Sequence, residues 1–293
     1  MDGVIVVDKA GGMTSHDVVN RLRRIANTRK IGHLGTLDPM ATGVLPLLIG
    51  RATRLAQFLA GGEKKYEGTI HFGWSTDTYD REGKPTSPEV RPTFTRQELE
   101  DGLEAFRGRF LQTPPAFSAK KIGGTPAYQL ARRQVQVDLA PVEVEVTTLE
   151  LIEFAGGIAR VRVDCSSGTY VRSIAHDLGR RLGCGAFLDA LRRTASGEFT
   201  EQQARPLQEL TELADAGNLE DALIPAAQLL PQFSSARVDA ATVTQIRQGK
   251  SFRISPFLSR PASKYVKAIN EEGELVAIGE ARLPHLYHPF LVL

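Results

Sequence analysis

The sequence predicts an α/β protein of the α+β type that ends in a small, strand-rich module. Residues 66–72 and 158–165 alternate apolar with polar side chains, which is typical of half-buried strands. Apolar residues at 18, 22 and 25 instead follow the spacing of a helix. The chain has 293 residues, enough to bury a large core, so we expect one large domain followed by a smaller one.

The N-terminal part is expected to begin with a strand at 4–8. Thr14 or Ser15 then provides a hydroxyl that caps the helix just described. A compact apolar run follows at 44–49, and apolar side chains between 55 and 59 indicate a further helix.

Two later segments, 75–95 and 113–128, are rich in Pro, Gly, Ser and Thr and are expected to be long loops. Long loops in compact domains are usually functional or disordered. The second segment carries two lysines and two aromatic residues without an acid. This composition favours a loop that contacts nucleic acid over a plain linker.

Strands are expected at 142–146 and 149–154, followed by a helix over 170–183 and a second helix over about 186–193. The acidic segment 201–221, with six acids and one arginine, is expected to be helical and peripheral. The bases therefore concentrate elsewhere. That distribution suits a protein with one face toward nucleic acid, although a merely solvated surface would show it too.

The character of the chain changes around Pro231. Beyond it we expect one short helix and then strands at 265–269, 274–279 and 290–293, with a hairpin turn at 270–273. The predicted domains are therefore 1–230 and 231–293.

Composition sets broad limits on function. The hydrophobic share of 42% and charged share of 24% are ordinary for a soluble globular protein. The N-terminus lacks the basic, apolar pattern of a signal peptide, and no apolar run approaches the roughly 18 residues of a membrane span. We expect a cytoplasmic protein without membrane contact. The two cysteines, Cys165 and Cys184, lack CxxC spacing and are expected to be reduced and buried.

The most informative segment is GHLGTLDPMATGVLP at 32–46. Between Arg21 and Arg54 the chain has seven cations, and its only carboxylate there is Asp38. An Asp before Pro is often a simple turn residue. A lone acid among bases repels phosphate, however, so it suits catalysis on a substrate that the bases have gathered.

Arg172 is the second unusual residue, because it falls in the first turn of the helix expected at 170–183, where the helix dipole disfavours a cation. Either an RNA phosphate or a buried carboxylate would compensate. If Asp38 is the partner, the pair would keep the acid ionised and lower its pKa by about 1–3 units. An ionised, buried Asp can act as a nucleophile or a base.

Other candidates are less specific. Tyr66 lies on the apolar face of its strand, so it is either a core residue or a platform for stacking on a base. A structural or RNA-contacting role suits His33 better than metal binding. The sequence has no P-loop, GxGxxG, HExxH or EF-hand pattern, so we expect chemistry without a cofactor or metal.

The segment at 32–46 resembles the signature of the TruB family of pseudouridine synthases. KKYEG at 64–68, TDTYDREG at 76–83 and CSSGTYVRSIAHDLG at 165–179 are similar to further motifs of that family, in the same order. The resemblance covers residues 3–230, and the C-terminal module resembles a PUA-type RNA-binding domain. One departure is Ala10, where the family usually has proline after lysine.

The resemblance implies the pseudouridine synthase fold, a long, curved, mainly antiparallel sheet flanked by helices, with an RNA-clamping insertion near 113–141. It implies that Asp38 is the catalytic aspartate, that Arg172 is its ion-pair partner, and that Tyr66 stacks on the target base and assists proton removal. It also implies a second set of residues that line the uridine pocket or belong to family motifs: His33, Tyr170, Leu191, Asp80 and Lys9.

The implied activity is the isomerisation of uridine 55 in the T loop of tRNA, after base flipping and without a cofactor. Asp38 would attack C1′ or remove the C2′ proton, and the sequence does not choose between these routes. The implied partner is tRNA, bound by its T arm and also by its acceptor end if the C-terminal module reaches that far. We expect a monomer without an obligate protein partner.

Two alternatives are the same reaction on another RNA, such as ribosomal RNA, and a role mainly in RNA binding or folding. The compact C-terminal module and the close motif match argue against the first alternative. The presence of Asp38, Tyr66 and Arg172 together argues against the second.

Overall fold

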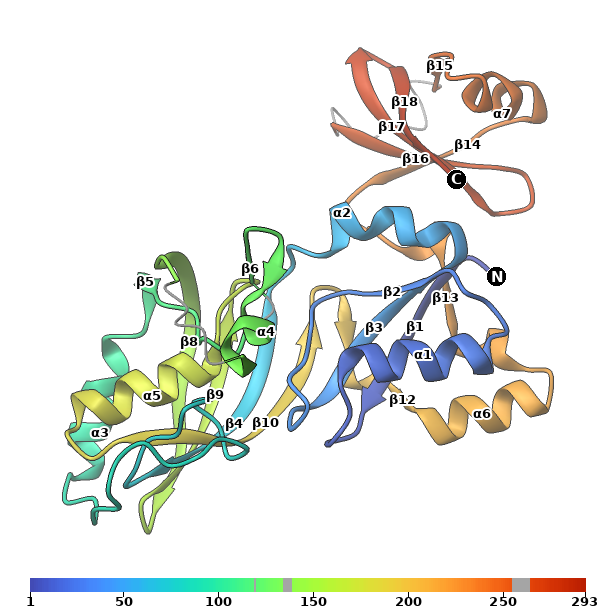
Figure 1. Cartoon of the computed structure of the whole chain (residues 1–293). Coiled ribbons are helices and arrows are strands. Elements are labelled where there is room, and N and C mark those ends of the chain that lie inside the picture. The colour runs from blue at the N-terminus through green and yellow to red at the C-terminus, as the bar shows by residue number, and fades with distance from the viewer. Residues whose placement is uncertain (119, 134–138, 255–263) are drawn as a thin grey trace.

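The computed structural model describes residues 1–118, 120–133, 139–254 and 264–293. Within these ranges the strands form an 11-stranded sheet, a 5-stranded sheet and a 2-stranded hairpin (Figure 1). No helix of the described residues is both long and apolar enough to span a lipid bilayer.

The large sheet is mainly antiparallel, as the resemblance implied. Only its β1–β12 and β10–β3 pairs are parallel among the pairings of the described residues. Its main path runs β12 (Arg205–Pro206), β1 (Gly3–Lys9), β3 (Thr42–Ile49), β10 (Ala186–Ser196), β4 (Lys64–Phe72), β9 (Ile158–Cys165), β8 (Val142–Ala155) and β5 (Gly108–Gln112). Three short strands pair beside this path: β2 (Ile31–His33), β11 (Phe199–Thr200) and β13 (Leu223–Pro225).

Helices cover the two ends of this sheet (Figure 1). At one end α1 (Ser15–Ile25) contacts α6 (Leu207–Asp215), and at the other α5 (Val171–Arg181) contacts α3 (Arg96–Glu104). The short turns that complete the domain are η1 (Gly50–Leu55), α2 (Ala56–Leu59), η2 (Glu201–Gln203), η3 (Leu219–Ala222) and η4 (Ala226–Gln228).

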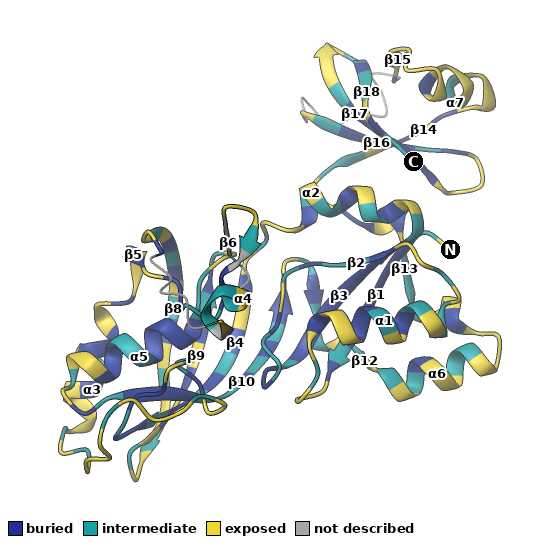
Figure 2. Ribbon diagram, in the orientation of Figure 1, coloured by how far each residue is buried: buried dark blue, intermediate teal, exposed yellow. Residues whose placement is uncertain are grey.

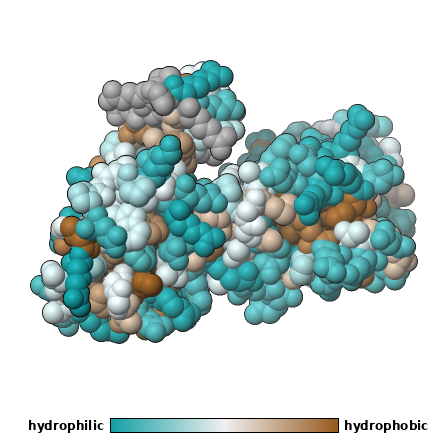
Figure 3. All heavy atoms as spheres, turned by 60° about the horizontal axis from the view of Figure 1, so that its bottom comes forward, coloured by the Kyte–Doolittle hydropathy of each residue, from teal (hydrophilic) through white to brown (hydrophobic). Residues whose placement is uncertain are grey.

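The core lies between these helices and the sheet, as the dark ribbon segments of Figure 2 show. One apolar cluster joins Leu22 of α1, Leu45 of β3, Ile70 of β4, Val163 of β9 and Ile174 of α5. The alternating burial predicted for 66–72 and 158–165 is confirmed in β4 and β9. Hydrophilic residues cover most of the face seen in Figure 3, with apolar residues in limited patches.

The helix predicted at 186–193 is wrong, because this segment is strand β10, paired with β3 and β4 in the middle of the sheet. Register shifts at Leu188/Ala190 and Arg193/Ala195 interrupt the alternation of its side chains. β-Bulges of this kind remove the period-two signal that identifies a strand in a sequence. The strands predicted at 142–146 and 149–154 are likewise one irregular strand, β8.

Helix α3 was not predicted, although its N-terminus carries a sequence signal. The Thr95 hydroxyl accepts from the Glu98 amide, and the Glu98 carboxylate accepts from the Thr95 amide. This capping box satisfies amides that the first helical turn leaves without partners. Thr14 and Asp17 form the same motif at the start of α1, which settles the cap between the two predicted residues.

The predicted insertion at 113–141 contains a hairpin of β6 (Lys121–Ile122) and β7 (Thr125–Pro126), followed by α4 (Ala127–Arg132). Residues 119 and 134–138 of this segment lie outside the described residues.

The C-terminal sheet runs β14 (Ser234–Arg237), β16 (Tyr265–Ile269), β17 (Leu275–Leu283), β18 (Leu286–Val292) and β15 (Phe252–Arg253), with α7 (Ala240–Arg247) beside it. Its three main strands agree with the prediction, whereas β14 and β15 were missed. Leu275 and Leu291 pack in one cluster with Val4 and Leu48 of the large sheet. The buried Lys267 donates from Nζ to the carbonyl oxygens of Ala227 and Leu229, at 2.9 and 2.7 Å.

Candidate active site

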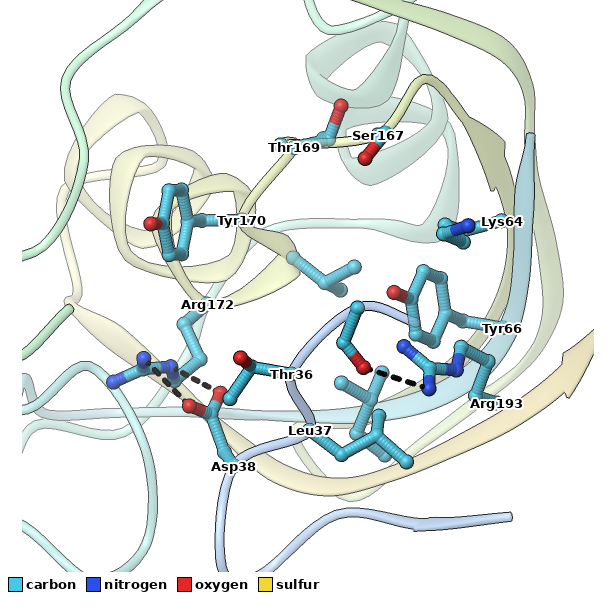
Figure 4. A pocket seen from close by; sticks show the side chains of 14 residues that line it. Thr36, Leu37, Asp38, Lys64, Tyr66, Ser167, Thr169, Tyr170, Arg172 and Arg193 are labelled. Carbon is cyan, nitrogen blue, oxygen red and sulfur yellow. Dashed lines mark hydrogen bonds and ion pairs between the residues drawn. The ribbon is translucent and has the colours of Figure 1, made fainter. Parts of the chain in front are cut away.

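A pocket of about 260 Å³ opens where the loop of residues 35–38 meets strands β4 and β10 and the start of α5 (Figure 4). Its volume lies just below the range for drug-sized ligand sites, about 300–1,000 Å³. Five predicted site residues from four separate parts of the chain line it: Asp38, Tyr66, Tyr170, Arg172 and Leu191.

The loop that carries Asp38 is fixed at several points. The Ser15 hydroxyl accepts from the Leu37 amide at 2.8 Å and donates to the Leu37 carbonyl oxygen at 3.1 Å. After the loop, Gly43 has a φ of +98°, and a Cβ there would lie 2.2 Å from the Arg193 carbonyl oxygen. Only glycine allows β3 and β10 to approach this closely at that conformation. The loop therefore holds Asp38 in one place at the pocket wall.

Asp38 and Arg172 form a two-point ion pair (Figure 4). Arg172 Nη2 donates to Asp38 Oδ1 at 3.0 Å, and Nε lies 2.8 Å from Oδ2. The Arg172 side chain is 4% exposed and that of Asp38 is 31% exposed. The carboxylate thus faces the pocket, while the guanidinium behind it is closed off from water. Planar, paired contacts of this type fix orientation as well as charge.

The two Nη atoms of Arg172 make further hydrogen bonds, whereas Nε meets Asp38 only as an ion-pair contact without hydrogen-bond geometry. Nη1 donates to the Thr78 carbonyl oxygen at 2.9 Å and to Asp80 Oδ2 at 3.3 Å, and Nη2 donates to the Phe117 carbonyl oxygen at 3.1 Å. Two carboxylates therefore balance the positive charge of Arg172, which the helix dipole disfavours at the start of α5. Of the two partners that the sequence left open, a phosphate or a carboxylate, the structure provides carboxylates.

Asp80 is held by its own turn. Its Oδ1 accepts from the Thr78 hydroxyl at 2.6 Å and from the Glu82 amide at 3.0 Å. Between Thr78 and Asp80, Tyr79 has a φ of +64°, and its ring stacks on His176 with centroids 3.7 Å apart. This turn does not line the pocket, but it fixes the acid that lies behind Arg172.

Burial raises the pKa of the Asp38 carboxyl above its ordinary value; the Arg172 charge opposes this rise and the Asp80 carboxylate adds to it. The predicted lowering of this pKa is therefore wrong, because removal of the acid from water outweighs the ion pair. A raised pKa makes the ionised carboxylate a stronger base, and that ionised form is lost as the pH falls through the raised value.

Tyr66 and Leu191 supply the apolar part of the pocket from neighbouring strands, β4 and β10. Burial raises the pKa of the Tyr66 phenol, and the Arg193 guanidinium against its hydroxyl opposes that rise. Tyr170 precedes α5, and its backbone is fixed by Gln112, which accepts from the Tyr170 amide at 2.8 Å and donates to its carbonyl oxygen at 3.0 Å.

Lys9 and His33 do not line the pocket. Lys9 Nζ donates to the carbonyl oxygens of Ala10 and Pro39 at 2.9 and 3.0 Å, so it supports the loop directly after Asp38. Burial lowers the pKa of Lys9 to about 8, and the Asp38 charge opposes this shift. His33 lies on β2, and its Nδ1 is buried without a hydrogen-bond partner among the described residues. His33 does not line this pocket, and its predicted role toward the bound RNA stays a prediction.

Sequence reasoning missed two buried cations of the pocket, Lys64 and Arg193. Arg193 was placed on the wrong type of element. Its Nε donates to the Val44 carbonyl oxygen at 2.7 Å and its Nη2 to that of Gly35 at 3.1 Å. Lys64 belongs to the KKYEG motif at 64–68, in which the sequence predicts a role only for Tyr66. Its spacing of two residues from Tyr66 on an alternating strand was the signal that it faces inward.

Two family models match the chain: "TruB family pseudouridylate synthase (N terminal domain)" over residues 23–171 and "tRNA pseudouridylate synthase B C-terminal domain" over residues 172–231. The chain is 60% identical over 293 residues to a tRNA pseudouridine synthase B of Solibacter usitatus (strain Ellin6076), with 100% of both chains covered. It is 48% identical over 231 residues to one of Opitutus terrae (strain DSM 11246 / JCM 15787 / PB90-1), covering 79% of this chain and 95% of the relative.

A similar solved structure carries the description "Crystal Structure of a Cbf5-Nop10-Gar1 Complex". It has a TM-score of 0.69 and 27% identity, and the match covers 95% of this chain and 78% of that chain.

Proposed function

We propose a mechanism on the premise that this chain belongs to the TruB family of pseudouridylate synthases. The chain is an isomerase that converts uridine to pseudouridine in the T loop of tRNA. We infer that uridine 55 is the target. The reaction breaks the N1–C1′ bond, turns the uracil and rejoins it to C1′ through C5. Since it needs no electron donor and no external group, we propose that it proceeds without a cofactor.

The single observation that carries this mechanism is the Asp38–Arg172 pair at the wall of the pocket. Arg172 holds the Asp38 carboxylate in a fixed orientation and leaves part of it open to a bound nucleotide. That carboxylate attacks C1′ or removes the C2′ proton. Either route needs a reactive group fixed close to the ribose, and fixed geometry is the main contribution of such a residue.

The target uridine must leave the stacked T loop to reach this carboxylate, at a cost of a few kcal/mol. We propose that Tyr66 stacks on the flipped base and that Leu191 closes the apolar part of the pocket. Both side chains are buried at the pocket wall. After C5 joins C1′, the proton on C5 must leave, either to a water molecule or to the Tyr66 hydroxyl, which passes its own proton to water as it accepts this one.

Exposed bases outside the pocket are suited to holding the RNA backbone, among them Arg21 and Arg24 on the outer face of α1. Such contacts position the RNA without reading its bases. We further propose that the C-terminal sheet adds contacts toward the acceptor end of the tRNA, that the protein is a monomer without an obligate protein partner, and that it acts in the cytoplasm.

The proposal is tested with a T-arm stem–loop RNA, a stem–loop whose target uridine is replaced by cytidine, and a ribosomal RNA fragment. We expect pseudouridine at one loop position of the first RNA and none in the other two, mapped after nuclease digestion. Product only in the ribosomal fragment would support the alternative substrate. Tight binding of the T arm without product would support a role in RNA binding or folding.

A further inference from the structure

Lys64 is a buried cation at the pocket wall. Its residue is 4% exposed, and among the described residues its Nζ has no hydrogen-bond partner. It lies on the inward face of β4, two residues before Tyr66, and it lines the pocket. An ammonium group has three protons to donate, and leaving all of them unpaired in a protein interior is costly.

A second buried cation lies beside it. Arg193 is 1% exposed, and a Cβ placed on Gly35 would lie 3.4 Å from Arg193 Nη1 and 3.5 Å from Lys64 Cε. The two cations therefore flank the same glycine. Neither takes part in a salt bridge within the described part of the chain, although surface cations such as Lys65 do.

The two sides of the pocket thus differ in charge (Figure 4). On one side the charge of Arg172 is balanced by Asp38 and Asp80. On the other side, Lys64 and Arg193 carry two positive charges that pair with no carboxylate of the described residues. The ionisable groups that affect the pKa of Lys64 are Arg193 and the Cys165 thiol. Retaining two unbalanced buried charges costs stability, which suggests that an anion forms or binds beside them.

We propose that Lys64, together with Arg193, stabilises the negative charge that develops on the uracil when its bond to ribose breaks. This inference rests on the proposed function. When N1–C1′ breaks, both bonding electrons stay with the uracil and spread over N1, O2 and O4. In the second step an electron pair of the ring forms the C5–C1′ bond while the Asp38 carboxylate leaves C1′ or, on the other route, while Asp38 returns its proton to C2′; the C5 proton then leaves. Charges fixed in advance where an anion develops are among the strongest catalytic devices.

The location favours the uracil over an RNA phosphate. Asp38, on the opposite side of the pocket, must reach the ribose, so the base extends toward the side that holds Tyr66, Lys64 and Arg193. The buried Nζ of Lys64 has almost no contact with bulk solvent. Phosphates of a bound RNA lie at the rim of a pocket that accepts a flipped base, where the exposed bases meet them.

The test compares Lys64→Met with a matched control, Lys65→Met. Lys65 is the next residue on β4, but its side chain is 48% exposed, points away from the pocket and pairs with Asp164. We expect Lys64→Met to lower the single-turnover rate of pseudouridine formation by about 10²–10³-fold, the range for loss of one oxyanion donor. The RNA affinity should stay unchanged, and Lys65→Met should match the wild type in both measurements.

A second substrate tests the charge on the uracil. Fluorine at C5 withdraws electrons and makes the uracil a better leaving group, so its detachment should depend less on Lys64. For RNA that carries 5-fluorouridine at the target, the measurement is the rate at which 5-fluorouridine disappears. Lys64→Met should lower this rate by a smaller factor than it lowers the rate measured with uridine. An equal loss on both substrates would overturn the proposal.

Weaker RNA binding by Lys64→Met, with a normal rate and a lower salt dependence, would also overturn it and identify Lys64 as a phosphate contact.

Lys64→Arg keeps the test valid if Lys64→Met does not fold. Burial and Arg193 lower the pKa of Lys64 to about 8, whereas an arginine stays charged. The groups that face this position, Cys165 and Tyr66, have pKa values raised by burial. Lys9, whose pKa burial also lowers to about 8, is the same in both proteins. The wild-type rate should therefore fall more steeply above pH 8 than that of Lys64→Arg; parallel profiles would refute the proposal. Failure of the wild type on every T arm would instead refute the proposed function.

Discussion

Replacing Arg172 with methionine removes the group that orients Asp38 while keeping an unbranched stem about as long as the aliphatic part of arginine. The change deletes the 3.0 and 2.8 Å contacts to Asp38 and leaves Asp80 without its cation. Removal of one partner from a buried ion pair costs about 3–5 kcal/mol of stability. A domain of 150–250 residues loses about 2–4 °C of melting temperature per kcal/mol. The variant should therefore melt measurably lower, and all assays should be run below that transition.

The effect on catalysis follows from the same contacts. Burial already raises the pKa of Asp38, and Arg172 opposes that rise. Without the arginine the acidic limb of the rate–pH profile should move upward by about 1–3 pH units. The single-turnover rate at neutral pH should fall at least about 10²-fold, because the carboxylate also loses its fixed orientation.

The assay is pseudouridine formation on a T-arm stem–loop between pH 5 and 9, with RNA affinity measured in parallel. Arg172→Lys serves as a control that keeps the charge but loses the two-point geometry, so it should recover only part of the rate. The assigned role of Arg172 in orienting Asp38 is refuted if Arg172→Met binds RNA more weakly while the rate of its RNA complex and the pH profile of that rate match the wild type. In that case Arg172 would be a phosphate contact.

Three further predictions concern the surroundings of this pair. Asp80→Asn removes a like charge beside Asp38, so the acidic limb of its rate–pH profile should move to lower pH; an upward shift would contradict the assigned influence of Asp80. Lys64 has a pKa of about 8 in the folded protein and a higher one when unfolded, so the unfolded state binds more protons between pH 8 and about 10.5. Denaturant titration of the wild type relative to Lys64→Met should therefore show stability that rises with pH across that window. RNA affinity should fall with salt by about 0.7–0.9 log units per log unit of salt for each phosphate contact. A double variant, Arg21→Ala with Arg24→Ala, should show a smaller slope of log affinity against log salt. An unchanged slope would exclude these two residues as contacts of the RNA backbone.

The contact between Asp38 and Arg172 could be predicted from the sequence because the charge of each residue is unfavourable in its local environment. Asp38 is the only acid in a basic segment, and Arg172 is a cation at the wrong end of a helix dipole. Conflicts of this kind concentrate at functional sites, where a distant part of the chain resolves them. Here the resolving contact joins residues 134 positions apart.

Other features could not be predicted, for physical reasons. Strand β10 contains two register shifts, so its side chains follow neither the period of a strand nor a reliable helical period. The error placed Arg193 on a helix and concealed its contact with Tyr66. The sign of the Asp38 pKa shift depends on how far the folded protein excludes water from the carboxyl, and no local sequence pattern reports that burial.

The proposed catalysis depends most on the carboxylate of Asp38, and Asp38→Asn tests that role most directly. The substitution keeps the shape of the side chain and removes its charge, while Asp101→Asn on the exposed face of α3 provides a matched control. The measurement is single-turnover pseudouridine formation on a T-arm stem–loop, with RNA affinity determined on the same samples. We predict no pseudouridine from Asp38→Asn, with RNA binding largely retained and normal product from Asp101→Asn. Formation of pseudouridine by Asp38→Asn at the wild-type rate would contradict the central claim.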